Sequence, residues 1–297
     1  MGVDRTRGLF VGLVTLDVIQ LVDRLPQPNE KIKGLADELA AGGPATNAAV
    51  AFSALGGSAT LLTRAGDCPA WALAAADLAG RSVRCVRAPS VAGRGLTAAT
   101  VLVTRATGER AVVSTHDRSP AGKTQPDFSA TIEGLDLAGF GVVELDGHEA
   151  DLAAAVARRA RAAGVPVVLD GGSWKPATSS LLPLTDAAIV SEDFAPTGVA
   201  PEAVLDFLVE QGVRHAAITR GHLPIRYVSD GVSGEVRVPA VQAVDTLGAG
   251  DFFHGAACHH IARAGLTRES FVAALALGAE VASRSVRSFG TRSWLDA

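Results

Sequence analysis

A short segment near the carboxyl end combines an acidic residue with glycines at a spacing suited to phosphate chemistry. It reads Val-Asp-Thr-Leu-Gly-Ala-Gly-Asp over residues 244–251, and an apolar, helix-like stretch follows it directly. Glycine permits turns that aim several backbone N–H groups at one point, and the start of a helix adds partial positive charge there. The same field favours an ionised Asp251, which is then placed to take a proton from a hydroxyl beside the phosphate. The segment predicts phosphoryl transfer to an alcohol, although an ordinary glycine turn at a helix start shares part of this pattern.

A second glycine-rich block lies in the amino-terminal part of the chain. It reads Gly-Gly-Pro-Ala-Thr-Asn over residues 42–47 and opens an alanine-rich, helix-like stretch. Gly42 and Gly43 allow the backbone to approach a polyol closely, and Asn47 offers a donor and an acceptor to sugar hydroxyls. The alternative is a glycine turn that leads into a core helix.

The apolar run over residues 9–19 indicates one buried strand that carries an aspartate near its end. Burying the carboxylate of Asp17 between Leu16 and Val18 is unfavourable unless it gains hydrogen-bond partners, and vicinal sugar hydroxyls are suitable ones. The alternative is an exposed aspartate on an edge strand.

The elements that must position these groups alternate between strands and helices. Continuous apolar runs separated by amphipathic stretches predict a mostly parallel sheet in a three-layer α/β/α sandwich, with ligands at the carboxyl ends of the strands. The strand-like runs are 141–145, 165–169, 187–190 and 216–219, and the helix-like runs are 150–163 and 201–211.

Two regions interrupt this rhythm, at about 15–40 and 97–115. In the second, apolar residues at 101–103 and 111–113 flank a polar turn at 107–109, which predicts an antiparallel hairpin. Alternating apolar residues such as Val101, Val103 and Val112 are too many for one small sheet to cover. We therefore expect a homodimer formed through this sheet.

Together, the two glycine blocks resemble the paired signatures of the ribokinase/PfkB family of sugar and nucleoside kinases. The resemblance covers essentially the whole chain and implies a single ribokinase-like kinase domain over residues 1–297, with a small β-sheet lid from the two interrupting regions. It implies an ATP-dependent sugar kinase in which Asp251 is the catalytic base. The backbone of Gly248, Ala249 and Gly250 would then stabilise charge on the γ-phosphate.

The same resemblance assigns binding roles. Asp17, Gly42, Gly43 and Asn47 would hold the sugar. Arg110, just after the hairpin turn, would meet the transferring phosphate, with a solvent-exposed arginine as the alternative.

On the nucleotide side, the resemblance assigns Thr219, Gly221, Asp245 and Thr246, although residues 222–224 lack the family's usual second glycine. Glu192 would stand for an acidic residue that organises metal-bound water, although the family's accompanying asparagine is absent. The implied cofactors are ATP and Mg²⁺, with K⁺ as a further candidate, and no residue is assigned as a direct metal ligand.

The substrate is indicated less sharply. Residues 11–57 are most similar to ketohexokinases, which implies a ketose, but Asn29 and Pro44 replace two expected sugar contacts. The Gly-Gly-Pro-Ala run at 42–45 and residues 168–171 are similar to sulfofructose kinases, whose sulfonate would need a cation. Ketogluconates and nucleosides remain alternatives, and so does a non-catalytic sensor of sugar or nucleotide. The candidate cations are Lys31, Arg94 and His148.

Composition excludes several partners. The net charge of −4 over 297 residues offers no basic footprint for nucleic acid or an anionic membrane. The three cysteines at 68, 85 and 258 have neither metal-pair spacing nor the number of a disulfide framework. These few, widely spaced cysteines fit a reducing compartment, so we expect a cytoplasmic enzyme. The apolar run near the amino end is too short to cross a bilayer.

Overall fold

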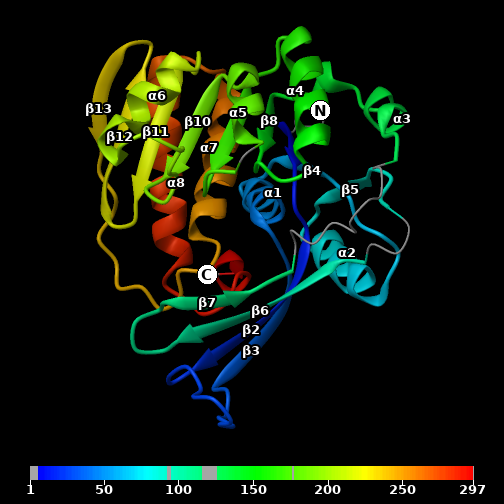
Figure 1. The fold of residues 1–297 in the computed structure, drawn as a ribbon, viewed down its shortest axis with the longest axis vertical. Helices are drawn as coiled ribbons and strands as arrows, with labels where there is room; N and C mark the ends of the chain where they lie inside the picture. Colours follow the sequence, from blue (N-terminus) through cyan, green and yellow to red (C-terminus); the bar gives the residue numbers. More distant parts are fainter. Residues whose placement is uncertain (1–5, 92–94, 116–125, 176, 297) are drawn as a thin grey trace.

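The computed structural model describes residues 6–91, 95–115, 126–175 and 177–296. A nine-stranded sheet lies between two layers of helices, and a separate four-stranded sheet projects from one end of the molecule (Figure 1). This is the predicted α/β/α sandwich with a small second sheet.

The large sheet is parallel over seven neighbouring strands and ends in an antiparallel pair. Its inner strands are short apolar runs buried on both faces, as a covered parallel sheet requires. In spatial order the strands are β13 (Val232–Val236), β12 (Leu223–Ser229), β11 (His215–Arg220), β10 (Ala187–Ser191), β9 (Val167–Gly171), β8 (Val142–Leu145), β1 (Arg7–Val11), β4 (Ser58–Thr63) and β5 (Arg84–Arg87).

Two cores form because successive side chains of a strand point to opposite faces. On β1, Leu9 and Val11 pack into the core beneath one helical layer, and Phe10 packs into the other. The first layer contains α3 (Ser129–Glu133), α4 (Ala150–Ala162), α5 (Thr178–Leu181) and α6 (Val204–Glu210); the second contains α1 (Pro44–Ala54), α2 (Pro69–Gly80), α7 (Ala249–Ala264) and α8 (Arg268–Ser285).

Four short 3₁₀ turns complete the regular structure of the described residues. The predicted helix over 201–211 begins as one of these turns and continues as α6. No helix among the described residues is long and apolar enough to span a membrane. The turns are Leu137–Gly139, Leu182–Leu184, Pro201–Ala203 and Ser293–Asp296.

The small sheet contains the predicted hairpin. Its strands lie in the order β3 (Ala36–Gly42), β2 (Thr15–Val22), β6 (Thr97–Thr104) and β7 (Arg110–Val113). Val101 on β6 pairs with Val112 on β7 in antiparallel register, which confirms the hairpin. We call this sheet the lid.

The prediction of one strand over residues 9–19 was wrong. The chain leaves the large sheet after Val11 and enters the lid at Thr15, so Asp17 lies on β2. The break falls at Gly12, where a Cβ atom would overlap the carboxylate of Asp146. The apolar run therefore contains two strands that belong to different sheets. It looks continuous in the sequence because both strands are buried.

The lid has a covered face and an exposed one. Val101 and Val103 are buried with Ile19 and pack against Leu247 and Phe289, so these two need no second subunit to cover them, whereas Val112 is 51% exposed. The exposed face instead presents a row of register partners. Its apolar members are Leu39, Val18 and Val113, which are 51%, 36% and 70% exposed.

Candidate active site

The site begins where α7 begins. Gly248 precedes the helix in the left-handed conformation, with a φ of 74°, and a Cβ there would lie 3.0 Å from the ring of Phe252. Beside Gly250, no described atom lies within 4 Å of where a Cβ would stand, so the backbone is open on that side. The first N–H groups of a helix have no carbonyl partner within it, which leaves them for an anion.

Asp251 lies in the first turn of α7 and is partly buried. Its Oδ2 accepts a hydrogen bond of 2.8 Å from Nδ2 of Asn47, in the first turn of α1. Burial, reinforced by the charge of Asp170, raises the pKa of Asp251 to about 7, against the hydrogen bond from Asn47 and the charge of Arg110. A carboxyl that titrates near neutral pH is suited to take and release a proton.

Further acidic groups lie behind this carboxyl. Asp170, at the end of β9, lies with its Oδ1 3.3 Å from Nε2 of His254. Burial raises the pKa of Asp170 to about 7. Burial lowers the pKa of His254 to about 3, so the imidazole is neutral. Asp146 follows β8 and accepts from the backbone N–H groups of Leu13, Ala45 and His148, which ties β1, α1 and β8 together.

The predicted sugar residues lie at the root of the lid. Asp17 is buried and accepts a hydrogen bond of 2.5 Å from Oγ1 of Thr15. Burial raises the pKa of Asp17, and the Thr15 hydrogen bond and the charge of Arg292 act against that rise. A Cβ on Gly42 would overlap the Asp17 carboxylate, so glycine is required there by close approach.

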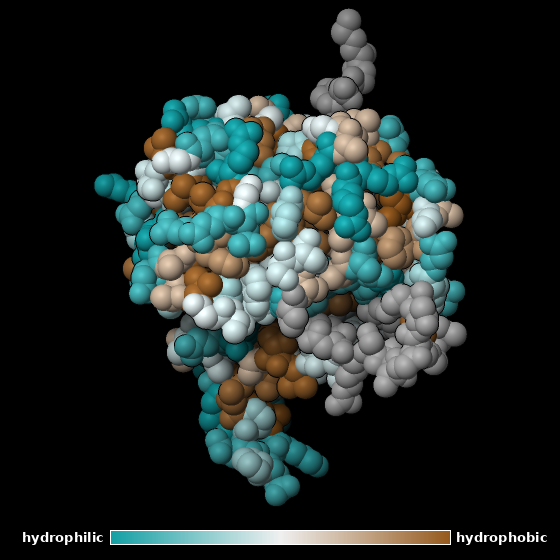
Figure 2. All heavy atoms as spheres, turned by 45° about the horizontal axis from the view of Figure 1, so that its top comes forward, coloured by the Kyte–Doolittle hydropathy of each residue, from teal (hydrophilic) through white to brown (hydrophobic). Residues whose placement is uncertain are grey.

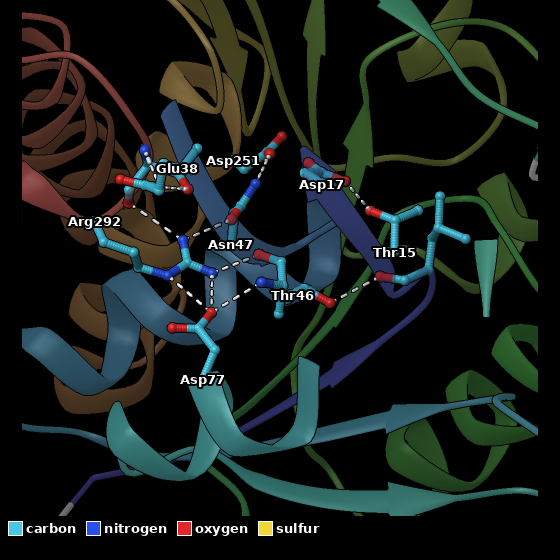
Figure 3. Close-up of polar contacts among 11 residues, drawn as sticks. Thr15, Asp17, Glu38, Thr46, Asn47, Asp77, Asp251 and Arg292 are labelled. Carbon is cyan, nitrogen blue, oxygen red and sulfur yellow. Dashed lines mark hydrogen bonds and ion pairs between the residues drawn. The ribbon is translucent and has the colours of Figure 1, made fainter. Parts of the chain in front are cut away.

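Gly43 precedes α1 and has a φ of 103°, a conformation that favours glycine. A Cβ there would overlap the carbonyl oxygen of Leu13. The glycine pair therefore packs the start of α1 against the end of β1 and the root of the lid. Figure 3 draws Asp17, Asn47 and Asp251 together at this junction.

Sequence reasoning missed Arg292, which is 5% exposed. Its guanidinium donates to Oδ1 of Asn47 at 3.1 Å, to Oδ2 of Asp77 at 3.0 Å and to the carbonyl oxygen of Ala41 (Figure 3). No motif marks an arginine in a short irregular segment, so only the folded chain reveals this contact. Asp146 and Asp170, by contrast, each follow a predicted strand directly, which is a usable signal.

Asp245 was assigned to the cofactor side. Its carboxylate is buried and accepts from the N–H groups of Leu247 and Gly290, at 2.8 and 2.9 Å. It therefore holds the loop before α7 against the carboxyl-terminal segment. Next to Gly290, Thr291 donates through its N–H and its hydroxyl to Oε1 of Glu38 on β3, both at 2.8 Å.

The lid hairpin touches the same loop. Oγ1 of Thr246 donates to the carbonyl oxygen of Gly108 at 3.0 Å and accepts from Nη1 of Arg110 at 3.2 Å. A pocket of about 360 Å³ lies between the hairpin and Thr246. Arg110 is exposed, as its alternative interpretation expected, yet it lies close enough for its charge to act on the pKa of Asp251.

The other cofactor candidates lie at the carboxyl ends of β10 and β11. The backbone N–H of Glu192 donates to the carbonyl oxygen of Thr219 at 3.0 Å, and Glu192 is exposed. Gly221 follows with a φ of 57° and is also exposed. In the described part of the chain, these three residues make no hydrogen bond or ion pair with Asp251, so they form a separate group at the same edge of the sheet.

In the described part of the chain, no three His, Cys, Asp or Glu side chains converge on a position for a metal ion. Of the cations proposed for a sulfonate, Lys31 is exposed in the loop between β2 and β3, and the backbone N–H of His148 donates to Asp146. Arg94 lies outside the described residues.

The start of α7, a carboxyl whose pKa burial raises to about 7 and the lid beside them form an arrangement suited to phosphoryl transfer to a hydroxyl. The chain belongs to the pfkB family of carbohydrate kinases, whose family model matches residues 6–297. It is 31% identical over 261 residues to an ATP-dependent ribose-1-phosphate kinase of Halopiger xanaduensis, covering 83% of this chain and 82% of that protein.

Solved structures agree in fold. A candidate ribokinase from Agrobacterium tumefaciens is 27% identical, with a TM-score of 0.84 and 99% of both chains covered. Ribokinase of Arabidopsis thaliana, solved with ribose and ATP, is 22% identical, with a TM-score of 0.75 and 98% of both chains covered. The ribokinase-like fold expected from the sequence is confirmed.

Proposed function

We propose that this carbohydrate kinase transfers the γ-phosphate of ATP to a hydroxyl of a small sugar, with Asp251 as the catalytic base. The observation that carries the proposal is the position of Asp251. Its carboxyl lies in the first turn of α7, bonded to Asn47, with a pKa raised to about 7. The group that takes the proton thus lies at the helix end that attracts phosphate.

In the reaction, the acceptor hydroxyl gives its proton to Oδ1 of Asp251, the carboxylate oxygen that Asn47 does not contact. The hydroxyl oxygen forms a bond to the γ-phosphorus as the bond to the β–γ bridging oxygen breaks, and ADP leaves with that electron pair. The backbone N–H groups of Gly248 and Gly250 stabilise charge on the phosphoryl oxygens. Those of Leu247 and Ala249 are used within the protein, because they donate to Asp245 at 2.8 Å and to the carbonyl oxygen of Thr246 at 3.4 Å. The residues mainly position the reactants and supply charge, which is what phosphoryl transfer needs.

Asp17 and Asn47 orient the sugar beneath the lid, with the glycines at 42 and 43 allowing its close approach. Thr219 and Gly221 lie at strand ends suited to ATP phosphates. Mg²⁺ commonly binds through one or two carboxylates plus substrate phosphates, so the exposed Glu192 fits it without a preformed cage. Bound there, Mg²⁺ would neutralise phosphate charge. No donor set supporting K⁺ stands out in the described residues.

For the acceptor, the resemblance of residues 11–57 supports a ketose. A second candidate is a pentose 1-phosphate, the acceptor in the name of the Halopiger relative. Such an acceptor needs a cation, and Lys175 offers one: its Nζ lies 3.6 Å from where a Cβ on Gly147 would stand, beside the end of β8. Its charge also acts against the rise in the pKa of Asp170 that burial causes.

An acceptor panel tests the proposal. Mg·ATP is supplied with D-fructose, D-ribose, D-ribose 1-phosphate, 2-keto-3-deoxygluconate, 6-sulfofructose or adenosine, and ADP release is measured. We expect turnover with at least one sugar, and Lys175→Met to impair only a phosphorylated or otherwise anionic acceptor. Saturable binding without ADP formation across the panel would instead identify a sensor.

The exposed face of the lid supports a homodimer. Figure 2 shows apolar residues gathered on the part of the molecule that carries the lid, with polar residues at its tip. Leu39, Val18 and Val113 lie on three of the four strands that this row crosses, and an uncovered apolar sheet is an association surface. We propose that a second copy of the chain covers it.

A further inference from the structure

A single side chain, that of Asn47, lies between the guanidinium of Arg292 and the proposed base, Asp251. Nη1 of Arg292 donates to Oδ1 of Asn47 at 3.1 Å, and Nδ2 of Asn47 donates to Oδ2 of Asp251 at 2.8 Å. Asn47 is 3% exposed, so water does not easily replace either bond. Arg292, Asn47 and Asp251 therefore form one hydrogen-bonded chain (Figure 3).

The direction of this chain is fixed by chemistry. A guanidinium has donors only, whereas an amide has one donor end and one acceptor end. With Arg292 in place, the oxygen of Asn47 must face it, because a rotated amide would set two donors against each other. The NH₂ group must then face Asp251.

That direction matters to the base. An NH₂ donor bonds more strongly to an ionised carboxylate than to a neutral carboxyl group. A rotated amide would present its oxygen instead and accept a hydrogen bond from protonated Asp251. Arg292 thus excludes the orientation that would stabilise the protonated acid.

Arg292 is itself held firmly. Oδ2 of Asp77 on α2 accepts from its Nε and Nη2 at 3.2 and 3.0 Å, and the carbonyl oxygens of Ala41 and Thr291 accept as well. The neighbouring Thr291 is bonded to Glu38 of the lid. The carboxyl-terminal segment therefore anchors the lid strand β3 and orients Asn47 through adjacent residues.

We infer that Arg292 is a positioning residue that fixes the amide orientation of Asn47 and thereby keeps Asp251 in its ionised, proton-accepting form. The inference rests on the proposed role of Asp251 as the base. Other groups also act on Asp251 and stay unchanged when Arg292 is replaced. They are Arg110 on β7, Glu144 on β8, Asp146 after β8 and Asp170 on β9.

The sequence provides a direct probe, because Asn29 and Asn47 are its only asparagines. Protein labelled with ¹⁵N in asparagine alone gives two side-chain NH₂ signals, assigned by their loss in Asn29→Asp and Asn47→Asp. Asn29 is exposed in the loop between β2 and β3 and serves as the internal control. The signal of Asn47 should titrate with Asp251, at a midpoint near pH 7 in the wild type.

Arg292→Gln retains a polar side chain but adds an acceptor, so it permits the amide to rotate. We expect the Asn47 midpoint to move to higher pH by about half a unit or more. Arg292→Lys, which still only donates, should restore most of the wild-type midpoint. Arg81→Met, which removes an arginine paired with Asp296 in the carboxyl-terminal turn, should leave it unchanged.

Kinetics with Mg·ATP and the preferred panel acceptor give the second readout. Arg292→Gln should lower kcat about 3-fold or more near pH 6.5 and less at pH 8.5, with the KM for ATP nearly unchanged. An unmoved Asn47 midpoint in folded Arg292→Gln, or an equal loss at both pH values, would overturn the inference. If Arg292→Gln does not fold, the midpoint of Arg292→Lys decides: a large upward shift despite a folded protein would contradict a donor-only role.

Failure of the underlying function has a different signature. Should Asp251→Asn keep full turnover while the Asn47 titration still responds to Arg292, the base assignment is wrong and the hydrogen-bond chain remains. If Asp251→Asn loses turnover but the titration of Asn47 does not change when Arg292 is replaced, the proposed function stands and the inference about Arg292 is wrong.

Discussion

Asn47 and Asp251 are 204 positions apart in the sequence, and a hydrogen bond of 2.8 Å joins Nδ2 of the first to Oδ2 of the second. Each lies in the first turn of its helix, so the bond joins the starts of α1 and α7. The residue predicted to hold the sugar thus touches the residue predicted to activate it. The same hydrogen bond therefore links the residue proposed to bind the sugar to the residue proposed to accept its proton.

This contact gives a pH prediction. The base must be ionised to accept a proton, and the pKa of Asp251 is raised to about 7. The kcat/KM for the acceptor should therefore rise with pH through about 7 and fall roughly tenfold per unit well below it. A rate profile from pH 5 to 9 measures this, and its midpoint should match the titration of the Asn47 amide. A profile flat down to pH 5 would contradict the raised pKa.

Sugar recognition should separate from nucleotide binding. Asp17→Ala removes a buried carboxylate placed for sugar hydroxyls, so sugar use should weaken by roughly 2–4 kcal/mol while ATP affinity stays near wild type. Asn47→Ala should also lower kcat, because it removes the partner of Asp251. Asp37→Ala, exposed on the same lid, is the control. If Asp17→Ala weakens ATP binding and spares the sugar, the orientation of the site is reversed.

Much of this site could be predicted from the sequence, because several of its residues pack against glycines. A glycine is needed at these positions because the backbone turns sharply or a neighbouring side chain comes too close for a Cβ. Gly42 admits the Asp17 carboxylate and Gly248 turns the chain into α7, and both leave a visible spacing. Arg292 leaves none, because its partners come from α1, α2 and β3 and are brought together only by folding. The single strand expected over 9–19 failed for a related reason: apolarity reports burial but not which sheet buries a residue.

Stability should depend on Glu144. It lies on β8 with an exposure of 0%, and neither carboxylate oxygen has a hydrogen-bond partner among the described residues. Burial, with the nearby charges of Asp146 and Asp170, raises its pKa well above 4.5. Burial favours the neutral form of Glu144, so the folded protein is penalised wherever the unfolded chain would ionise this group. The contribution of Glu144 to stability is therefore complete below about pH 4.5 and is lost as pH rises towards its folded-state pKa.

Glu144→Gln removes that loss at nearly constant volume. Its free energy of unfolding, from urea titrations, should exceed that of the wild type at pH 8 and approach it at pH 4.5. Glu280→Gln, exposed on α8, should show little difference at either pH. A Glu144→Gln protein that is less stable at pH 8 would mean that the carboxylate is ionised and needed.

The lid predicts the oligomeric state. Light scattering at micromolar concentration should give twice the mass of 30.3 kDa for the wild type. Leu39→Glu places a charge in the exposed apolar row and should yield a monomer, whereas Leu73→Glu, exposed on α2, should not. A monomeric wild type would show that the row stays uncovered.

The central claim is that Asp251 takes the proton of the acceptor hydroxyl. Asp251→Asn keeps the shape of the side chain and its place beside Asn47 but removes the proton-accepting carboxylate. With the preferred acceptor and saturating Mg·ATP, turnover measured by ADP release should fall by about 10²- to 10⁴-fold, while ATP affinity by calorimetry stays within about 3-fold of wild type. Turnover that remains at the wild-type rate in folded Asp251→Asn would contradict the account.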